Sequence, residues 1–346
     1  MAVIWYPYLS ERCNKILSFP ISLVTMNNNM DSVAQIKFKN IPFYEVIDEV
    51  IKPTLLTGTK KCTLQDVPRG MKEATFNFNM SDEHAHLVAG SRYYSHGKYE
   101  TSYQFQIRMC QLIEPVPNES PDDRPLSLQI RVNMQNCPLP PTQQGFELRR
   151  TATPINCTEN VELSSIDGNN NIAIYWTPDT KKYVFAMFFV KKLTVDTLMK
   201  KLQDQDRISS EHTKDYIIKS YSNVDQDLAT ISHRLTLVCP LGLVRIKIPI
   251  KSIHCNHLQC FDAKTFILMN EKKETWLCPI CNKLCLFDDL KIDSYFLEVV
   301  SSTTLDESNI EILADGTWRA VEETINPRDD DEAGTSSEQG VVIEID

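Results

Sequence analysis

Two absences limit what kind of protein this sequence describes. It has only 10 glycines in 346 residues and no apolar run approaching the roughly 18 residues needed to cross a membrane. The first residues, MAVIWYPYLSERC, lack the basic segment and long apolar core of a secretory signal. A hydrophobic content of 42% therefore indicates a globular intracellular protein of two or three domains. In a reducing compartment we expect the scattered cysteines to be buried free thiols, namely Cys13, Cys62, Cys110, Cys137 and Cys157.

The sequence also lacks an overall positive charge and the short motifs of common enzymes. The net charge is −10, and residues 326–346 hold seven acids and one arginine, or −6, which leaves −4 on the first 325 residues. This balance does not support DNA or RNA binding through phosphate contacts. Neither Gly-x-Ser-x-Gly nor a phosphate-binding glycine loop occurs. The sequence therefore does not indicate a serine hydrolase or a P-loop enzyme.

What the sequence does contain is a group of cysteines and a histidine with the spacing of a zinc site. Cys255-x-His257-x-x-Cys260 and Cys278-x-x-Cys281 are separated by a spacer of 17 residues. Two such knuckles can complete a tetrahedral site with thiolate at about 2.3 Å and imidazole at about 2.0 Å. We predict one structural zinc ion bound by Cys255, His257, Cys278 and Cys281. Four protein ligands leave no open position to activate water, and a ligand role for His257 is favoured over that of a catalytic base.

The neighbouring cysteines fit half of a second zinc site. On the cross-braced pattern of RING domains, Cys239 takes the first ligand position and Cys260 the fifth, but the second and sixth fall on Gly242 and Ala263. Two ligands are too few for a structural zinc ion. Cys285, beyond the last ligand, is interpreted as a plain thiol, although it remains the one candidate for a labile site. We expect this half of the domain to be held by the packing of Leu243, Ile246, Ile248 and Ile250.

The surrounding segments resemble one family. CPLG, CNHLQCFDA, MNEKKETWLCPIC and DGTW are similar to the SP-RING of the PIAS/Siz family of SUMO ligases. Upstream, IPFYEVIDEVIKPT (41–54) and PINCT (154–158) resemble that family's PINIT domain, with Cys157 departing from its eponymous motif. The resemblance extends over roughly residues 36–320.

This resemblance implies a SUMO-protein ligase, a transferase that acts by positioning. Such a ligase would hold the thioester between SUMO and its conjugating enzyme in a reactive geometry while a substrate lysine attacks, without a covalent intermediate of its own. The implied partners are SUMO, the SUMO-conjugating enzyme and nuclear or chromatin-associated protein substrates, and the implied location is the nucleus. The implied contacts to the conjugating enzyme are Leu241, Trp276, Pro279 and Ile280, with a core role for Trp276 as the alternative.

The expected fold is a multidomain α+β protein. The alternation of apolar and polar residues at 103–109 and the dense apolar run at 183–190 are typical of strands, and they predict a β-sandwich-like PINIT domain over residues 36–192. EVIDEVI, residues 45–51, is interpreted as a short flanking helix. The other expected regions are an N-terminal segment without a recognisable SAP domain (1–35), a helical linker (193–235), the single-zinc RING-like SP-RING domain (236–289), its C-terminal extension (290–325) and a disordered acidic tail (326–346).

The tail ends in VVIEID. Val341, Val342, Ile343 and Ile345, with the acids around them, form the pattern of a SUMO-interacting motif, which would add a strand to the edge of SUMO's sheet. Two other functions remain open from the sequence. A RING-type ubiquitin ligase would use a similar scaffold, although ordinary RING domains keep both zinc sites. A non-enzymatic transcriptional or chromatin adaptor would use the zinc module for binding alone.

Overall fold

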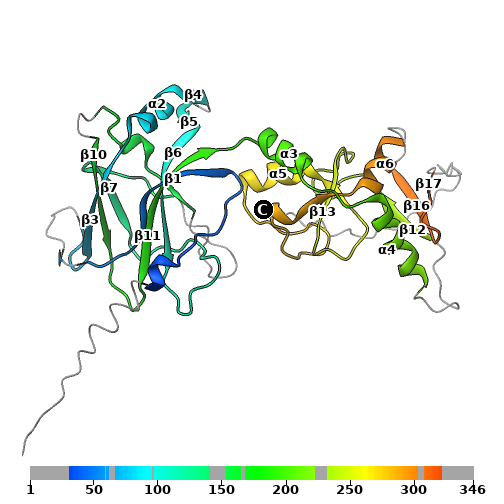
Figure 1. Cartoon of the computed structure of the whole chain (residues 1–346), viewed down its shortest axis with the longest axis horizontal. Helices are drawn as coiled ribbons and strands as arrows, with labels where there is room; N and C mark the ends of the chain where they lie inside the picture. The colour runs from blue at the N-terminus through cyan, green and yellow to red at the C-terminus, as the bar shows by residue number, and fades with distance from the viewer. Residues whose placement is uncertain are drawn as a thin grey trace, which may run out of the picture. The chain divides into compact units, whose positions relative to one another are not determined.

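The computed structural model describes residues 31–58, 60–61, 67–95, 97–140, 153–164, 168–222, 232–302 and 308–321. The chain divides into two compact units after Thr194 (Figure 1). Cys13, Cys62 and the tail motif at 341–345 lie outside the described residues. Within the described residues, no helix is long and apolar enough to cross a membrane.

The first unit is a sandwich of two antiparallel sheets. One sheet has the strand order β1-β11-β6-β9 and the other β2-β3-β10-β7-β8 (Figure 1). The β-sandwich prediction is confirmed. The strands of the first sheet are β1 (Tyr44–Leu55), β11 (Tyr183–Lys192), β6 (Tyr103–Gln111) and β9 (Ile155–Asn156). Those of the second sheet are β2 (Lys60–Lys61), β3 (Lys72–Asn79), β10 (Asn169–Trp176), β7 (Gln129–Val132) and β8 (Gln135–Asn136).

The core of the sandwich comes from alternate residues of its strands, as a period of two requires. In β6 the residues Phe105, Ile107 and Met109 face inward, and each is at most 2% exposed. The alternate residues of β6 are polar but also buried, because other parts of the chain cover the outer face of this sheet. Arg108, for example, donates to both carboxylate oxygens of Asp122.

The segment EVIDEVI is part of strand β1, so the prediction of a helix there is wrong. β1 pairs with β11 from Tyr44 to Leu55, and its register shifts at three places along the way. Each irregularity breaks the period of two, which leaves apolar residues at positions that imitate helical spacing. Val46 and Ile47 are 56% and 47% exposed as a result.

Three small elements lie beside the first sheet. Helix α2 (Asp82–Gly90) begins at Ser81, whose hydroxyl accepts the His84 N–H at 3.1 Å, a standard N-cap. The hairpin of β4 (Arg92–Ser95) and β5 (Lys98–Thr101) follows α2 directly and lies at the same end of this unit in Figure 1. The short helix η1 (Thr158–Asn160) follows β9.

The second unit combines four helices with two small antiparallel sheets among its described residues. The sheets have the orders β12-β16-β17 and β14-β13-β15. Helices α3 and α4 lie in the region predicted to be a helical linker, residues 193–235, and both belong to this unit. Its elements are α3 (Val195–Asp204), α4 (Ser210–Ser222), β12 (Ser232–Thr236), β13 (Pro249–Ser252), β14 (Phe261–Asp262), α5 (Ala263–Lys272), η2 (Phe287–Asp289), β15 (Leu290–Ile292), α6 (Ser294–Ser302), β16 (Asn309–Leu313) and β17 (Trp318–Ala320).

A buried ion pair joins three elements of the second unit. Asp293, which is fully buried, precedes α6, and its carboxylate accepts from Lys251 Nζ of β13 and from Thr213 Oγ1 of α4, both at 2.9 Å. Its other oxygen accepts the Phe296 N–H at 3.3 Å at the start of α6. A buried charge needs these partners, because an unpaired buried charge lowers the free energy of unfolding by about 3–5 kcal/mol.

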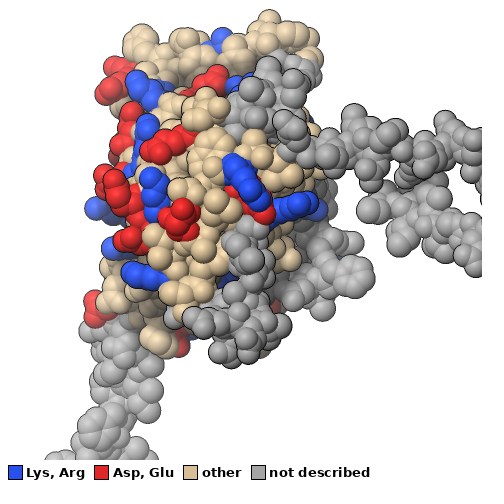
Figure 2. All heavy atoms as spheres, turned by 90° about the vertical axis from the view of Figure 1, so that its right-hand side faces the viewer, with Lys and Arg blue, Asp and Glu red and all other residues tan. Residues whose placement is uncertain are grey.

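The face of this unit that includes α4 and the β12-β16-β17 sheet has mixed charge. Figure 2 shows acidic and basic side chains interspersed on it rather than gathered into a patch of one sign. Some of them pair, as Arg319 does with Glu311 across β17 and β16. This face therefore has no basic stripe of the kind that follows a nucleic-acid backbone.

Candidate functional site

The first Cys/His knuckle follows strand β13 through a tight turn. β13 ends at Ser252, whose carbonyl accepts the Cys255 N–H at 3.0 Å and whose hydroxyl accepts the His254 N–H at 3.2 Å. Serine favours such turns because its hydroxyl can hydrogen-bond the backbone two residues on. The turn brings Cys255 and His257, both half-buried, to the end of the strand.

The second knuckle is a tight turn after helix α5. The Cys278 N–H donates to the Lys283 carbonyl at 2.8 Å, and the Asn282 N–H donates to the Cys278 carbonyl at 2.9 Å. Asn282 has a φ of +56°, a left-handed conformation that asparagine adopts more readily than most residues. Cys278 and Cys281 therefore share one turn and can approach the same point.

The two knuckles meet in a cluster suited to zinc. One donor atom from each of Cys255, His257, Cys278 and Cys281 lies within 4.8 Å of the others, and no second such cluster occurs among the described residues. The Cys255 and Cys281 sulfurs are 3.7 Å apart, close to the roughly 3.8 Å that tetrahedral angles and 2.3 Å zinc–sulfur bonds give. His257 Nδ1 lies 2.8 Å from the Gln259 carbonyl, which it can donate to, so that Nε2 is left to bind metal. Three thiols and one imidazole in this arrangement fit a structural zinc ion.

The protonation of the cluster also suits a cation. Burial lowers the pKa of His257, which favours the neutral imidazole that binds metals. The pKa of the Cys281 thiol is lowered, chiefly because the Lys283 N–H donates to it. Burial and the neighbouring thiols raise the pKa of Cys255 to about 12. A raised pKa favours the protonated thiol when no metal is bound. A bound divalent cation favours the thiolate form instead, because its charge stabilises all three thiolates together.

The other half of the RING-like unit is held by a carboxylate. Cys239 and Cys260 are buried, and Cys239 Sγ accepts the Asp262 N–H at 3.3 Å. Asp262 is 5% exposed; one of its oxygens caps α5 by accepting the Thr265 N–H at 2.9 Å, and the other accepts the Lys247 N–H at 3.0 Å. The hydrogen bonds that this buried carboxylate accepts thus join the loop that precedes Lys247 to α5, where an ordinary RING domain has a second metal.

Apolar packing contributes less to this half than predicted. Ile246 and Ile250 are buried and Ile248 is half-buried. Leu243, in contrast, is 81% exposed, so the prediction that it packs inside is wrong. It lies at the tip of a turn closed by the Cys239 N–H, which donates to the Val244 carbonyl at 2.7 Å, and its φ of +51° turns the chain outward.

Three of the four predicted docking residues, Leu241, Pro279 and Ile280, lie on two loops of this unit. Leu241 is half-buried in the first loop, next to Leu243 and Val244, which are 81% and 52% exposed. Pro279 and Ile280 are half-buried in the second knuckle. The exposure of Leu243 and Val244 was not predicted from the sequence. They begin an apolar run that resembles a buried strand, and the sequence does not show that a turn precedes it.

Trp276 is a correction to the predicted docking surface. Only 2% of it is exposed, and its ring makes edge contacts with Phe266 and Phe287 at centroid distances of 5.8 and 6.3 Å. Its backbone N–H donates to Asn270 Oδ1 at 2.8 Å, and its indole N–H donates to Glu274 at 2.9 Å. Trp276 therefore fixes the approach to the second knuckle from inside the core and offers no surface to a partner.

The described cysteines outside the cluster are all buried. The described ones are Cys110, Cys137, Cys157, Cys239, Cys260 and Cys285. Burial raises the pKa of Cys285 well above its ordinary value and that of Cys110 to about 12. A buried thiol with a raised pKa is a poor nucleophile, so Cys285 is not a labile site in the folded protein.

A β-sandwich unit followed by a RING-like unit with one Cys/His cluster defines a class of two-domain zinc protein. Comparison with known families agrees: residues 35–191 match the PINIT domain and residues 235–284 match the MIZ/SP-RING zinc finger. The chain is therefore similar to proteins of the PIAS/Siz family. Among solved structures, the SUMO E3 ligase SIZ1 of S. cerevisiae shares this fold with a TM-score of 0.64 and 23% identity, over 84% of this chain and 95% of that one.

Sequence relatives extend the same result. The human E3 SUMO-protein ligase PIAS2 is 35% identical over 290 residues, which cover 82% of this chain and 45% of PIAS2. The E3 SUMO-protein ligase gei-17 of Caenorhabditis elegans is 32% identical over 289 residues, or 82% of this chain and 36% of gei-17. The chain thus spans less than half the length of these curated relatives.

Proposed function

We propose that this chain is a SUMO-protein ligase that accelerates transfer of SUMO from its conjugating enzyme to substrate lysines by positioning. The strongest support is that two loops with apolar tips are held in place, the first by hydrogen bonds to Asp262 and the second by the Cys/His cluster. Leu243 and Val244 protrude from the first loop, and Pro279 and Ile280 form the second knuckle itself. Rigid apolar tips of this kind suit docking, because little side-chain order is lost on binding.

The metal has a structural part in this proposal. One zinc ion, bound by Cys255, His257, Cys278 and Cys281, would have no open coordination position and would supply folding energy rather than Lewis-acid chemistry. The described cysteines outside this cluster are all buried, which supports transfer without a covalent relay through this chain. The rate gain would come from holding the reacting groups in one geometry, worth several kcal/mol in favourable systems, on the order of 7 kcal/mol.

Contacts to SUMO would come from two further segments. Val341, Val342, Ile343 and Ile345 would add a strand to SUMO, with the adjacent acids facing a basic rim. The extension after the zinc finger, with α6, β16 and β17, would help to engage it. The substrates would be nuclear proteins, in keeping with a nuclear location for the chain.

A single-turnover assay tests this function. SUMO preloaded on its conjugating enzyme is mixed with free lysine, with and without the zinc-loaded full chain, and thioester loss is followed. We expect acceleration by the wild type and a loss of about tenfold or more in the double variant Leu243→Ala/Val244→Ala, with a smaller loss for Leu241→Ala. Ile218→Ala on α4, which removes a side chain that is 43% exposed, is the matched control and should leave the rate unchanged.

The other two functions predict different results. A folded, zinc-loaded wild type that does not accelerate release would contradict the proposal and favour the adaptor. Equal acceleration with ubiquitin-loaded enzymes would favour a ubiquitin ligase. Circular dichroism of each variant checks that the fold is retained.

A further inference from the structure

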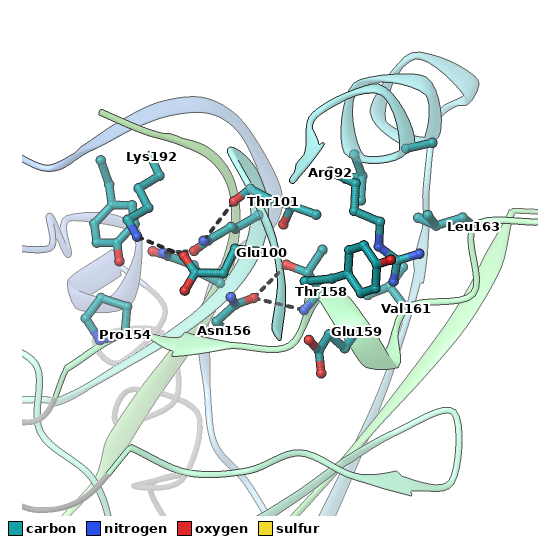
Figure 3. A pocket seen from close by; sticks show the side chains of 16 residues that line it. Arg92, Glu100, Thr101, Pro154, Asn156, Thr158, Glu159, Val161, Leu163 and Lys192 are labelled. Atoms are coloured by element: carbon teal, nitrogen blue, oxygen red, sulfur yellow. Dashed lines mark hydrogen bonds and ion pairs between the residues drawn. The ribbon is translucent and has the colours of Figure 1, made fainter. Parts of the chain in front are cut away.

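The sandwich unit contains a pocket that the proposed mechanism does not use. Its volume is about 440 Å³, and its walls come from the end of α2, the β4–β5 hairpin, the start of β6, and the segment from Pro154 to Leu163 (Figure 3). The segment PINCT, residues 154–158, lines it with alternate residues. Ile155 and Cys157 are buried in the core, while Pro154, Asn156 and Thr158 line the pocket.

Asn156 is held so that its amide nitrogen is available to a ligand. Its Oδ1 accepts from the Thr158 N–H at 3.0 Å and from Thr158 Oγ1 at 2.6 Å, as the dashed lines in Figure 3 mark. A backbone N–H can only donate, so the accepting atom must be the oxygen and the amide orientation is fixed. Thr158 is itself fixed, because its hydroxyl oxygen accepts the Phe105 N–H at 2.9 Å. Within the described residues, the Asn156 NH₂ group makes no hydrogen bond.

Gln106 supplies the complementary acceptor. It is 3% exposed and lies directly opposite Asn156 in the β6–β9 register, so both side chains are on the same face of the sheet. Its Nε2 donates to Gln104 Oε1 at 3.0 Å, and Gln104 Nε2 donates to the Thr101 carbonyl at 3.2 Å. These bonds orient the Gln106 amide, and its carbonyl oxygen accepts no hydrogen bond from the described residues. A fixed NH₂ donor and a fixed C=O acceptor therefore stand next to each other.

The walls carry two cationic and two anionic side chains, Arg92, Lys192, Glu100 and Glu159, so they have no net charge that would favour a small ion as the ligand. Lys192 Nζ lies 3.3 Å from Glu100 (Figure 3), and the same carboxylate accepts from Tyr93 OH at 3.2 Å. The Arg92 guanidinium lies over the Tyr99 ring, 5.6 Å from its centroid. A pocket with balanced charges and adjacent amide groups favours a neutral ligand that both donates and accepts hydrogen bonds.

The hairpin beside the pocket has the composition of a protein interface. Tyr94 and Tyr99 are 67% and 61% exposed and contact each other edge-on at 5.3 Å. Tyrosine and arginine are both enriched among the few residues that contribute most of the binding energy at protein–protein interfaces. These two rigid rings offer exposed apolar surface beside the pocket, against which the side chains of a bound polypeptide can pack.

We propose that this pocket binds an extended segment of a protein partner by its main chain. One peptide group of the segment would accept from the Asn156 NH₂ and donate to the Gln106 carbonyl, while flanking apolar side chains lie against Tyr94 and Tyr99. The binding does not depend on the ligase function, since neither the Cys/His cluster nor the docking loops take part. A failure of the single-turnover assay would leave it intact.

Peptide selection on the full chain tests the proposal. A phage-displayed library of short random linear peptides is selected on the wild type, and the affinity of each selected peptide is measured by fluorescence anisotropy. Asn156→Asp keeps the oxygen that accepts from Thr158 but replaces the NH₂ donor with an acceptor, and we expect it to weaken binding by about tenfold or more. Asn77→Asp is the matched control, because Asn77 Oδ1 accepts from Asn171 on the other sheet and the same charge change occurs outside the pocket.

Modified peptides separate the main chain from a side-chain amide as the bound group. N-methylation at one internal position should abolish binding, whereas replacing any Asn or Gln of the peptide with Leu should not. Loss of binding only on the latter change would overturn main-chain recognition. Selected peptides that bind Asn156→Asp as tightly as the wild type, or no enrichment of any peptide, would overturn the site itself. Unchanged thermal midpoints for both variants confirm that they fold.

Discussion

The two units of this chain reach stability by different means. The sandwich has one large apolar core to which both sheets contribute, with Phe105, Phe185 and Phe189 fully buried in it. The second unit has a smaller apolar cluster around Tyr295 and Phe296, and it depends on buried polar groups and on the Cys/His cluster. A large core tolerates the loss of one interaction, whereas a small domain without one usually needs a metal or a comparable cross-link. The two units should therefore respond differently to metal removal and to substitutions in their cores.

Metal removal should have the largest effect and should separate the units. Structural zinc supplies on the order of 10 kcal/mol of folding energy in zinc-finger peptides, so chelation should unfold the second unit and leave the sandwich folded. The buried Cys285 should then react with an alkylating reagent while the buried Cys110 stays protected, as measured by mass spectrometry. Restored zinc should restore protection of Cys285. Equal exposure of both thiols would mean that the units fold as one.

Loss of the buried ion pair should be the next largest effect. Asp293→Ala leaves Lys251, whose side chain is 11% exposed, without its carboxylate partner at 2.9 Å. Breaking such a pair costs about 3–5 kcal/mol, because the remaining charge is buried and uncompensated. Calorimetry of the zinc-loaded chain should show a lower transition temperature for the second unit alone. Asp196→Ala is the control, since that carboxylate is 84% exposed and its contact to Lys264 is screened by solvent; an equal shift in this control would contradict the account.

A matched pair of small deletions should give the smallest effect and the sharpest comparison. Ile107→Val in the sandwich and Ile310→Val in the second unit each remove one methylene at a position that is 0% exposed, and each should cost about 0.5–1.5 kcal/mol. After chelation, only Ile107→Val should still alter a folding transition in a denaturant titration. An effect of Ile310→Val in the metal-free chain would show that the second unit keeps its core without the ion.

Much of the fold was predictable because its signals are local. The spacing of Cys255, His257, Cys278 and Cys281 is a property of tight turns, and the structure brings the four together. The apolar run at residues 183–190 is a buried central strand, as its composition indicated. Helices α3 and α4 also lie within residues 193–235, where a helical segment was predicted.

The errors arose where tertiary contacts override a local pattern. The bulges of β1 are set by its pairing with β11, so EVIDEVI could imitate a helix. Trp276 was predicted to be exposed and is buried, whereas Leu243 was predicted to be buried and is exposed. Each lies in a turn with positive φ, and a single sequence does not reveal which side chains such a turn exposes. The pocket beside Asn156 needed the β6–β9 register, which joins residues 50 positions apart in the chain.

Titration of ligase activity with zinc tests the central claim most directly, namely that one metal-held unit presents the docking loops. The chelated chain is added to the single-turnover assay with SUMO-loaded conjugating enzyme, and zinc is returned in steps while bound metal is counted by mass spectrometry. The account predicts no acceleration without metal and full recovery at one ion per chain. Acceleration by the metal-free chain, or recovery that needs two ions, would contradict it.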